Sequence, residues 1–152
     1  MSGRPEGSEH FIVVGIDGSE ESKGALAWAA HQAELTGAEL RVLISWHISS
    51  MSYGYGMILP AEVDFEGASR DVLENTIKEV LGEACAIAVT PLVVQGYPAP
   101  SLLEAAHGAD LLVVGSRGHG AFAGMLLGSV GEHCVTHAAC PVVVVRRPPQ
   151  EA

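Results

Sequence analysis

The sequence is poor in basic residues: eight Lys and Arg stand against 18 Asp and Glu, which gives a net charge of −10. This balance disfavours nucleic acid and anionic lipid as main partners, because both carry negative charge. The three cysteines form no CxxC pair, which is typical of a reducing compartment. No apolar run reaches the roughly 18 residues of a membrane span, and residues 1–9 lack the apolar stretch of a signal peptide. We therefore expect a cytoplasmic protein that does not enter a membrane.

The apolar content is high enough for a real core. Hydrophobic residues make up 48% of the 152 residues, and a chain of this length fits one domain. We expect a disordered N-terminal tail over 1–9, one folded domain over 10–147 and a short C-terminal tail over 148–152.

Short apolar runs alternate with helical patterns along the chain. The alternation predicts an α/β fold: a single-domain, open, parallel five-stranded sheet of order 3-2-1-4-5 with helices on both faces. Pro91 lies inside the third run and indicates an edge strand or a bulge. The expected strands are 11–17, 40–46, 87–94, 111–115 and 142–145, and the expected helices are 19–37, 62–84, 101–107 and 129–138. The buried face of the second helix is expected to carry Ala68, Val72, Thr76, Ile77, Val80 and Ala84.

The stretch from Leu111 to Ser129 organises the rest of the chain. A continuous apolar run, typical of a strand buried on both faces, is followed by a glycine-rich loop and by Gly128-Ser129 at the start of a helix. Glycines let the backbone approach an anion, and the N–H groups at a helix start point at it. Strand, loop and helix start together form the usual setting for a bound phosphate.

Three strand ends are expected to meet near this loop. In open parallel sheets, ligands bind beyond the carboxyl ends of the strands, where the strand order reverses. Asp17, Trp46 and Gly115 end the first, second and fourth predicted strands. A carboxylate, an aromatic ring and a glycine loop on one ligand suit a nucleotide.

The loop matches neither of the two commonest phosphate motifs. The chain has no GxxxxGK(S/T) sequence, and the residues after the first strand do not spell GxGxxG. The spacing Gly115-x2-Gly118-x9-Gly128-Ser129 instead resembles the nucleotide-binding signature of the universal stress protein family. Four further motifs resemble that family in the same order: VGIDGS at 14–19, Gly96-x-Pro98, ADLLVVGSRG at 109–118 and CPVVVV at 140–145.

The resemblance implies an ATP-binding regulatory protein of the stress response that typically dimerises and turns over little or no substrate. By the resemblance, Asp17 and Trp46 lie near the adenosine, and the glycine loop lies at the ribose and phosphates. Magnesium is expected through the ATP phosphates rather than through protein ligands. Gly131 departs from the family, which often has a small hydroxyl residue at that position. The candidate nucleotide-binding residues are Ile16, Asp17, Gly18, Trp46, Gly115, Arg117, Gly118, His119, Gly128, Ser129 and Val130.

Simpler interpretations of these residues stay open. The glycine loop can be a tight connection without a ligand, Asp17 a helix-capping carboxylate, and Trp46 a lid on the edge of the core. Cys85 is expected in the core rather than as a nucleophile. His133, Cys134, His137 and Cys140 suggest a metal, but Cys134 is turned about 100° from His133 on a helix, so a closed tetrahedral site is hard to build.

Three functions remain in competition. The leading hypothesis is a nucleotide-dependent dimeric module without catalysis, since the loop has no base and no lysine for the γ-phosphate. The second is a slow ATPase or nucleotidyl transferase in the same pocket, with Asp17 and a divalent cation. The third is a ligand-free dimeric scaffold, which Gly131 keeps open. A homodimer is expected through Val142–Val145, because an apolar edge strand is a template for a second chain.

Overall fold

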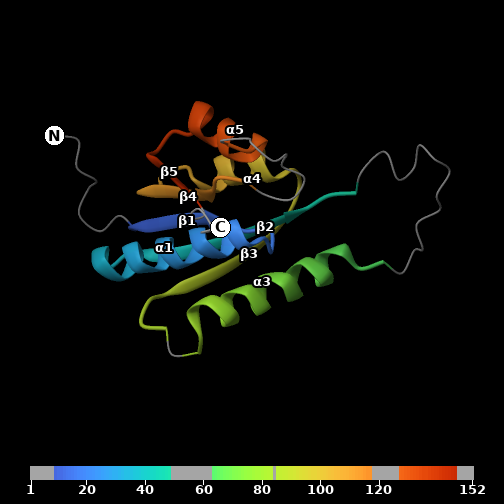
Figure 1. Ribbon diagram of the computed structural model, residues 1–152, viewed down its shortest axis with the longest axis horizontal. Coiled ribbons are helices and arrows are strands. Elements are labelled where there is room, and N and C mark those ends of the chain that lie inside the picture. Colours follow the sequence, from blue (N-terminus) through green and yellow to red (C-terminus); the bar gives the residue numbers. More distant parts are fainter. Residues whose placement is uncertain (1–8, 49–62, 84, 118–126, 147–152) are drawn as a thin grey trace, which may run out of the picture.

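The computed structural model describes residues 9–48, 63–83, 85–117 and 127–146. The predicted tails therefore lie outside the described residues, except for Glu9. Strands and helices alternate throughout the described part (Figure 1). The elements are β1 (Phe11–Gly15), α1 (Glu20–Thr36), β2 (Glu39–Trp46), α3 (Phe65–Leu81), β3 (Val89–Gln95), α4 (Pro98–Ala105), β4 (Leu111–Gly115), α5 (Ser129–His137) and β5 (Val142–Val145).

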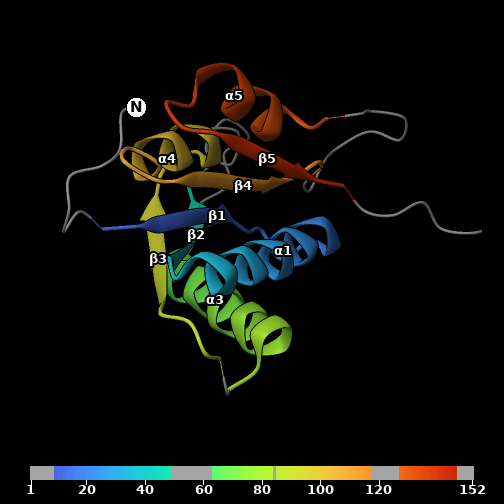
Figure 2. The ribbon, with the colours of Figure 1, turned by 90° about the vertical axis from the view of Figure 1, so that its left-hand side faces the viewer.

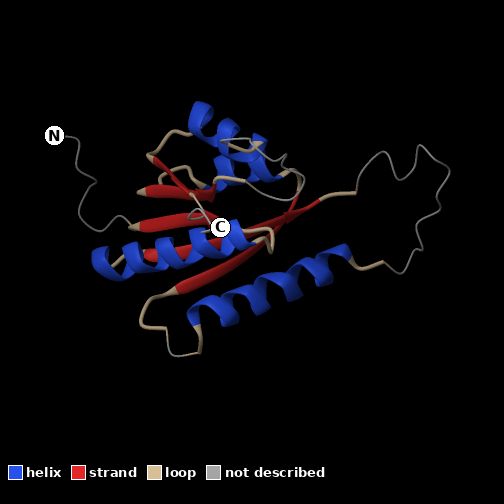
Figure 3. Cartoon of the chain, viewed as in Figure 1, coloured by secondary structure: helices blue, strands red, loops and turns tan. Residues whose placement is uncertain are grey.

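The strands form one parallel sheet of order β3-β2-β1-β4-β5, which confirms the predicted α/β fold (Figure 3). At the centre, Val14 of β1 lies between Val42 of β2 and Val113 of β4. Pro91 lies on β3, an edge strand of this sheet. An edge strand tolerates proline because its missing N–H can fall on the side without a partner.

Helices cover both faces of the sheet, as predicted. Helices α1 and α3 pack on one face and α4 and α5 on the other (Figures 1 and 2). Alternate side chains of each strand point to opposite faces of the sheet. Val14 points into the core between the sheet and α1/α3, and Val13 into the core between the sheet and α4/α5. Among the described helices, none is both long and apolar enough to span a bilayer.

Two details of the predicted core are wrong. Helix α3 buries Thr76 as predicted, but its other buried residue is Leu73, whereas Val72 is 39% exposed and Ala68 is also exposed. Ala84 lies outside the described residues. The apolar residues of this helix fit two alternative buried faces, one through Val72 and one through Leu73. The helix contacts β2 and β3 with the face through Leu73. Cys85 is exposed rather than in the core, because it lies in the connection between α3 and β3.

Candidate functional site at the carboxyl edge of the sheet

The strand order reverses between β1 and β4, so the candidate site lies where these two strands end. After β1 the chain turns at Gly18, whose φ of +83° is in the left-handed region that favours glycine. Asp17 is exposed, and its Oδ1 accepts a hydrogen bond from the Ser19 N–H at 2.9 Å. Ser19 is the N-cap of α1 and accepts from the Ser22 N–H. Ser19 rather than Asp17 therefore caps the helix, and Asp17 stabilises the turn that precedes it.

The end of β4 and the start of α5 are joined directly. The Gly128 N–H donates to the Ser116 carbonyl at 2.6 Å, and the Ser116 N–H donates to the Val145 carbonyl at 2.9 Å. The N-cap of α5 is Gly128, which has no side chain to accept from the first N–H groups of the helix. The first turn, with Ser129 and Val130, therefore provides donors suited to an anion.

Gly115 is closely packed against α1. A Cβ atom on Gly115 would lie 3.0 Å from the carbonyl carbon of Glu21 and 3.1 Å from its oxygen. Close approach of a helix is thus enough to require glycine here, whether or not a phosphate binds. This contact also holds the start of α1 beside the end of β4.

A cation and a carboxylate flank this corner. Arg117 follows β4 by two positions, and its Nη2 lies 4.0 Å from Oε1 of Glu21. Arg117 is 36% exposed, and Glu21 only 15%. The guanidinium can therefore turn to an incoming anion at little cost in desolvation. Glu21 gives no signal of a site in the sequence, where it is only a favourable carboxylate in the first turn of a helix.

Trp46 lies at the same edge of the sheet but on a projecting strand. Leu43 is level with Gly15, so β2 continues three positions beyond the end of β1. The Trp46 ring is half-buried and stacks on Phe65 of α3, with ring centres 6.3 Å apart and planes inclined by 12°. This contact fits the interpretation of Trp46 as a lid on the edge of the core. Phe65 gave no signal in the sequence, since residues 49–62 separate the two rings along the chain.

Most of the predicted site residues that the structure describes lie near this edge. Ile16 is buried, and its N–H donates to the Leu43 carbonyl at 2.9 Å. Gly118 and His119 lie outside the described residues. Direct contacts link the turn after β1, through α1 and Gly115, to the start of α5, whereas Trp46 contacts α3 and β3.

The family model of the universal stress protein family matches residues 10–146. The chain belongs to the universal stress protein family. A universal stress protein of Thermus aquaticus is 38% identical over 141 residues, covering 89% of this chain and 97% of the relative. One from Mycobacterium tuberculosis is 35% identical over 142 residues, covering 93% of this chain but 47% of the relative. The chain thus spans about half the length of the mycobacterial relatives.

Solved structures of universal stress proteins share the fold. One of them, described as a universal stress protein in complex with cAMP, has a TM-score of 0.68 and 26% identity. The match covers 90% of this chain and 96% of the chain in that structure.

Gly131 stands where the resemblance implies a small hydroxyl residue in the family, and the structure shows what occupies the space. A Cβ atom at Gly131 would lie 2.7 Å from Cδ1 of Leu127 and 3.6 Å from the Gly115 carbonyl oxygen. The Leu127 side chain therefore fills the place where a small hydroxyl side chain would stand. A hydroxyl donor at this corner of the site must therefore come from another residue, such as Ser129.

Of the two cysteines that suggested a metal in the sequence, Cys134 is fully buried and Cys140 is half-buried. Burial, with the neighbouring Cys140, raises the pKa of the Cys134 thiol to about 11, and burial also raises the pKa of Cys140. Both thiols therefore stay protonated at neutral pH. Cys134 belongs to the core of the α4/α5 layer, and Cys140 packs against that core. Within the described ranges, no group of three or more His, Cys, Asp or Glu could hold a metal ion.

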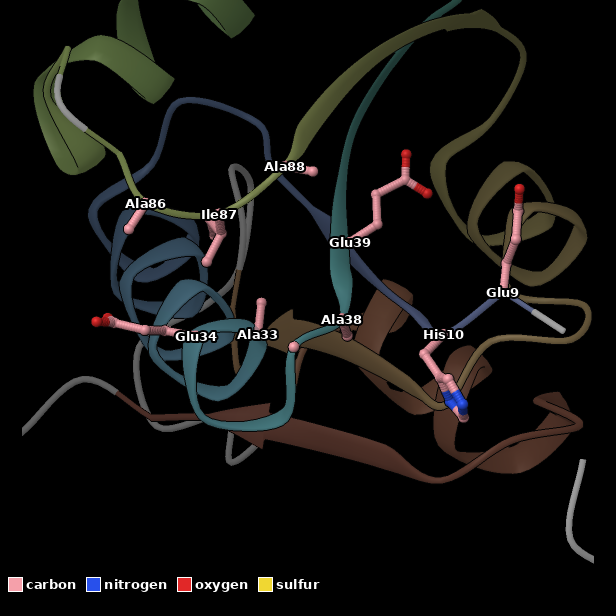
Figure 4. A pocket seen from close by; sticks show the side chains of 10 residues that line it. Glu9, His10, Ala33, Glu34, Ala38, Glu39, Ala86, Ile87 and Ala88 are labelled. Atoms are coloured by element: carbon pink, nitrogen blue, oxygen red, sulfur yellow. The ribbon is translucent and has the colours of Figure 1, made fainter. Parts of the chain in front are cut away.

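A pocket of about 480 Å³ opens at the opposite, amino edge of the sheet (Figure 4). Its walls come from the end of α1, the start of β2 and the segment before β3. None of the predicted nucleotide-binding residues lines it, so it does not belong to the candidate site. The lining residues are Glu9, His10, Ala33, Glu34, Gly37, Ala38, Glu39, Ala86, Ile87 and Ala88.

Proposed function

We propose that this chain is a nucleotide-binding regulatory module that binds ATP, with Mg²⁺ on the phosphates, at the carboxyl edge of the sheet. The observation that carries the proposal is the start of α5, which is capped only by a glycine and fixed beside the end of β4. Backbone donors at the positive end of a helix, at the point where the strand order reverses, form a site for phosphate. The cAMP complex of a similar universal stress protein supports an adenine nucleotide as the ligand.

The residues divide between the two ends of the ligand. Gly128, Ser129 and Val130 would face the phosphates with Arg117, which can leave Glu21 for a stronger anion. Ile16, Asp17, Gly18 and Trp46 would lie toward the adenosine. Gly115, Gly118 and His119 belong to the same proposal, as the end of β4 and the loop that follows it.

We propose that the module does not turn over ATP at an enzymatic rate. Lys23 lies on α1, near the site in sequence. Its Nζ forms ion pairs with Glu20 at 3.2 Å and with Glu79 at 3.0 Å. The Asp17 carboxylate is bonded within its own turn. A slow ATPase or nucleotidyl transferase would have to release one of these groups to assist a phosphoryl transfer.

Mass analysis of small molecules released from denatured protein, followed by calorimetric titration with ATP and magnesium, tests the proposal. We expect an adenine nucleotide in the released fraction or saturable one-to-one binding by the emptied protein. A timed hydrolysis assay then separates a binding module from an enzyme, because ordinary enzymes turn over about once per second or faster. Absence of both released nucleotide and binding would favour the ligand-free scaffold.

We further propose that two copies pair through β5. This strand is an edge of the described sheet, and Val142–Val145 are all half-buried. The carbonyl of Pro141 accepts from Leu112 of β4, and that of Val145 accepts from Ser116, the residue after β4. Because a parallel ladder uses alternate residues, the N–H groups of Val142 and Val144 face outward, toward a second chain.

Val144→Pro is expected to convert the dimer into a monomer. It removes an outward N–H and puts a ring in the path of the partner strand, while leaving the bonds to β4 in place. Light scattering at micromolar concentration measures the mass, and circular dichroism checks that the variant is folded. The charge variant Val143→Lys with Val145→Lys should also give monomers. A parent protein with a monomer mass would contradict the proposed interface.

A further inference from the structure

Helix α5 carries two histidines that the proposed nucleotide site does not use. His133 and His137 are both exposed and lie one turn apart on the same face of the helix. Their ring centres are 5.2 Å apart, and the ring planes are inclined by 44°. Cys134, between them in sequence, points into the core instead and is fully buried.

The spacing of the two rings suits a shared metal ion. An imidazole nitrogen binds Zn²⁺ at about 2.0–2.1 Å, with tetrahedral angles between ligands, which places the centres of two rings on one ion roughly 5 Å apart. The rings of His133 and His137 already have this separation. Since both side chains are exposed, binding requires no opening of the core and little loss of packing.

We propose that His133 and His137 form an open, two-ligand site for a divalent transition-metal ion of the Zn²⁺, Cu²⁺ and Ni²⁺ class, which imidazole favours. Water fills the other positions on the ion, because the described residues supply no third His, Cys, Asp or Glu. The site differs from the closed four-ligand site that the sequence disfavours, as it uses neither buried thiol. The nucleotide phosphates are proposed to bind at the first turn of α5. The two histidines lie beyond that turn.

The experiment is calorimetric titration of the full chain with ZnCl₂ after removal of bound nucleotide. The parent protein is expected to bind one Zn²⁺ at this site. The decisive variant is Val135→His with His137→Val, which keeps the number of histidines on α5 but separates the pair by about 200° around the helix. Val135 is 52% exposed, so the exchange leaves the core intact. A chelate that loses one arm should bind about tenfold more weakly or worse.

The matched control is His31→Asn with His107→Asn. It also removes two exposed histidines, but neither has another histidine at helical spacing. This control should bind Zn²⁺ with the affinity of the parent. His133→Asn alone and His137→Asn alone should each reduce the affinity for Zn²⁺ as much as the two changes together. Equal affinity in the parent and the exchange variant, or loss of binding in the control, would overturn the proposal.

Discussion

Replacing Ser129 with glutamate is expected to weaken ATP binding by about 30-fold or more, roughly 2 kcal/mol, without unfolding the protein. Ser129 is exposed and is the first residue of α5. In the absence of nucleotide, a carboxylate there is favourable, since the helix dipole is positive at this end and stabilises the acid by about 0.3–1 kcal/mol. With nucleotide bound, the same charge would lie beside the phosphates. At an effective dielectric constant near 20, repulsion between charges a few ångströms apart is large enough to cause this loss of binding free energy.

Opposite changes in affinity and stability make this variant informative. Calorimetric titration gives the affinity, and a thermal melt of nucleotide-free protein gives the stability, which should be unchanged or slightly higher. Ala27→Glu is the matched control, because it adds the same charge at an exposed position in the middle of α1. Unchanged affinity in the Ser129→Glu variant would exclude the start of α5 as the phosphate site.

Gly115→Ala is expected to destabilise the nucleotide-free protein by about 1–3 kcal/mol, the usual cost of overpacking a close contact. The added methyl group would press on the backbone of Glu21 at 3.0 Å, and backbone cannot turn aside as a side chain can. In a domain of this size the melting temperature should fall by about 2–10 °C. If Gly115 were glycine only to admit a phosphate, the stability of the nucleotide-free protein would stay at the parent value.

The same chemical change at Gly24 should act in the opposite direction. Gly24 is exposed on α1, and a Cβ atom there would meet only Cγ1 of Val145 at an ordinary 4.0 Å. Alanine inside a helix is favoured over glycine by about 0.5–1 kcal/mol. Thermal melts of the two variants, measured side by side, separate crowding at Gly115 from the general effect of losing a glycine. A Gly115→Ala variant as stable as Gly24→Ala would contradict the close contact with α1.

The strands and their order were predictable because their signal is local. Runs such as Leu111–Gly115 and Val142–Val145 are too apolar for a surface and too short for a typical helix, and the alternation with helices leaves few topologies. The ends of α1 were also predictable, because the expected range of 19–37 begins and ends on the two cap residues, Ser19 and Gly37. Each of these features depends on residues within a few positions of one another.

What the sequence did not predict is mostly contact between distant segments. Whether Val72 or Leu73 faces the core depends on how α3 rests on the sheet, which the periodicity alone leaves open. The stacking of Trp46 on Phe65 and the contact of Gly115 with Glu21 depend on distances between layers. The strand order predicts which edge of the sheet carries the candidate site, but it does not predict the contacts that each residue makes there.

The order of the elements along the chain has a consequence for biosynthesis. Among the described residues, the buried hydrophobic residues of the α1/α3 layer all come from residues 12–73, with the single exception of Val113. A ribosome therefore releases β1, β2, β3 and their two helices well before β4, although β4 pairs with the central strand β1. Until then the β4 side of β1 is an unpaired apolar edge, which is the kind of surface that aggregates or recruits chaperones during translation.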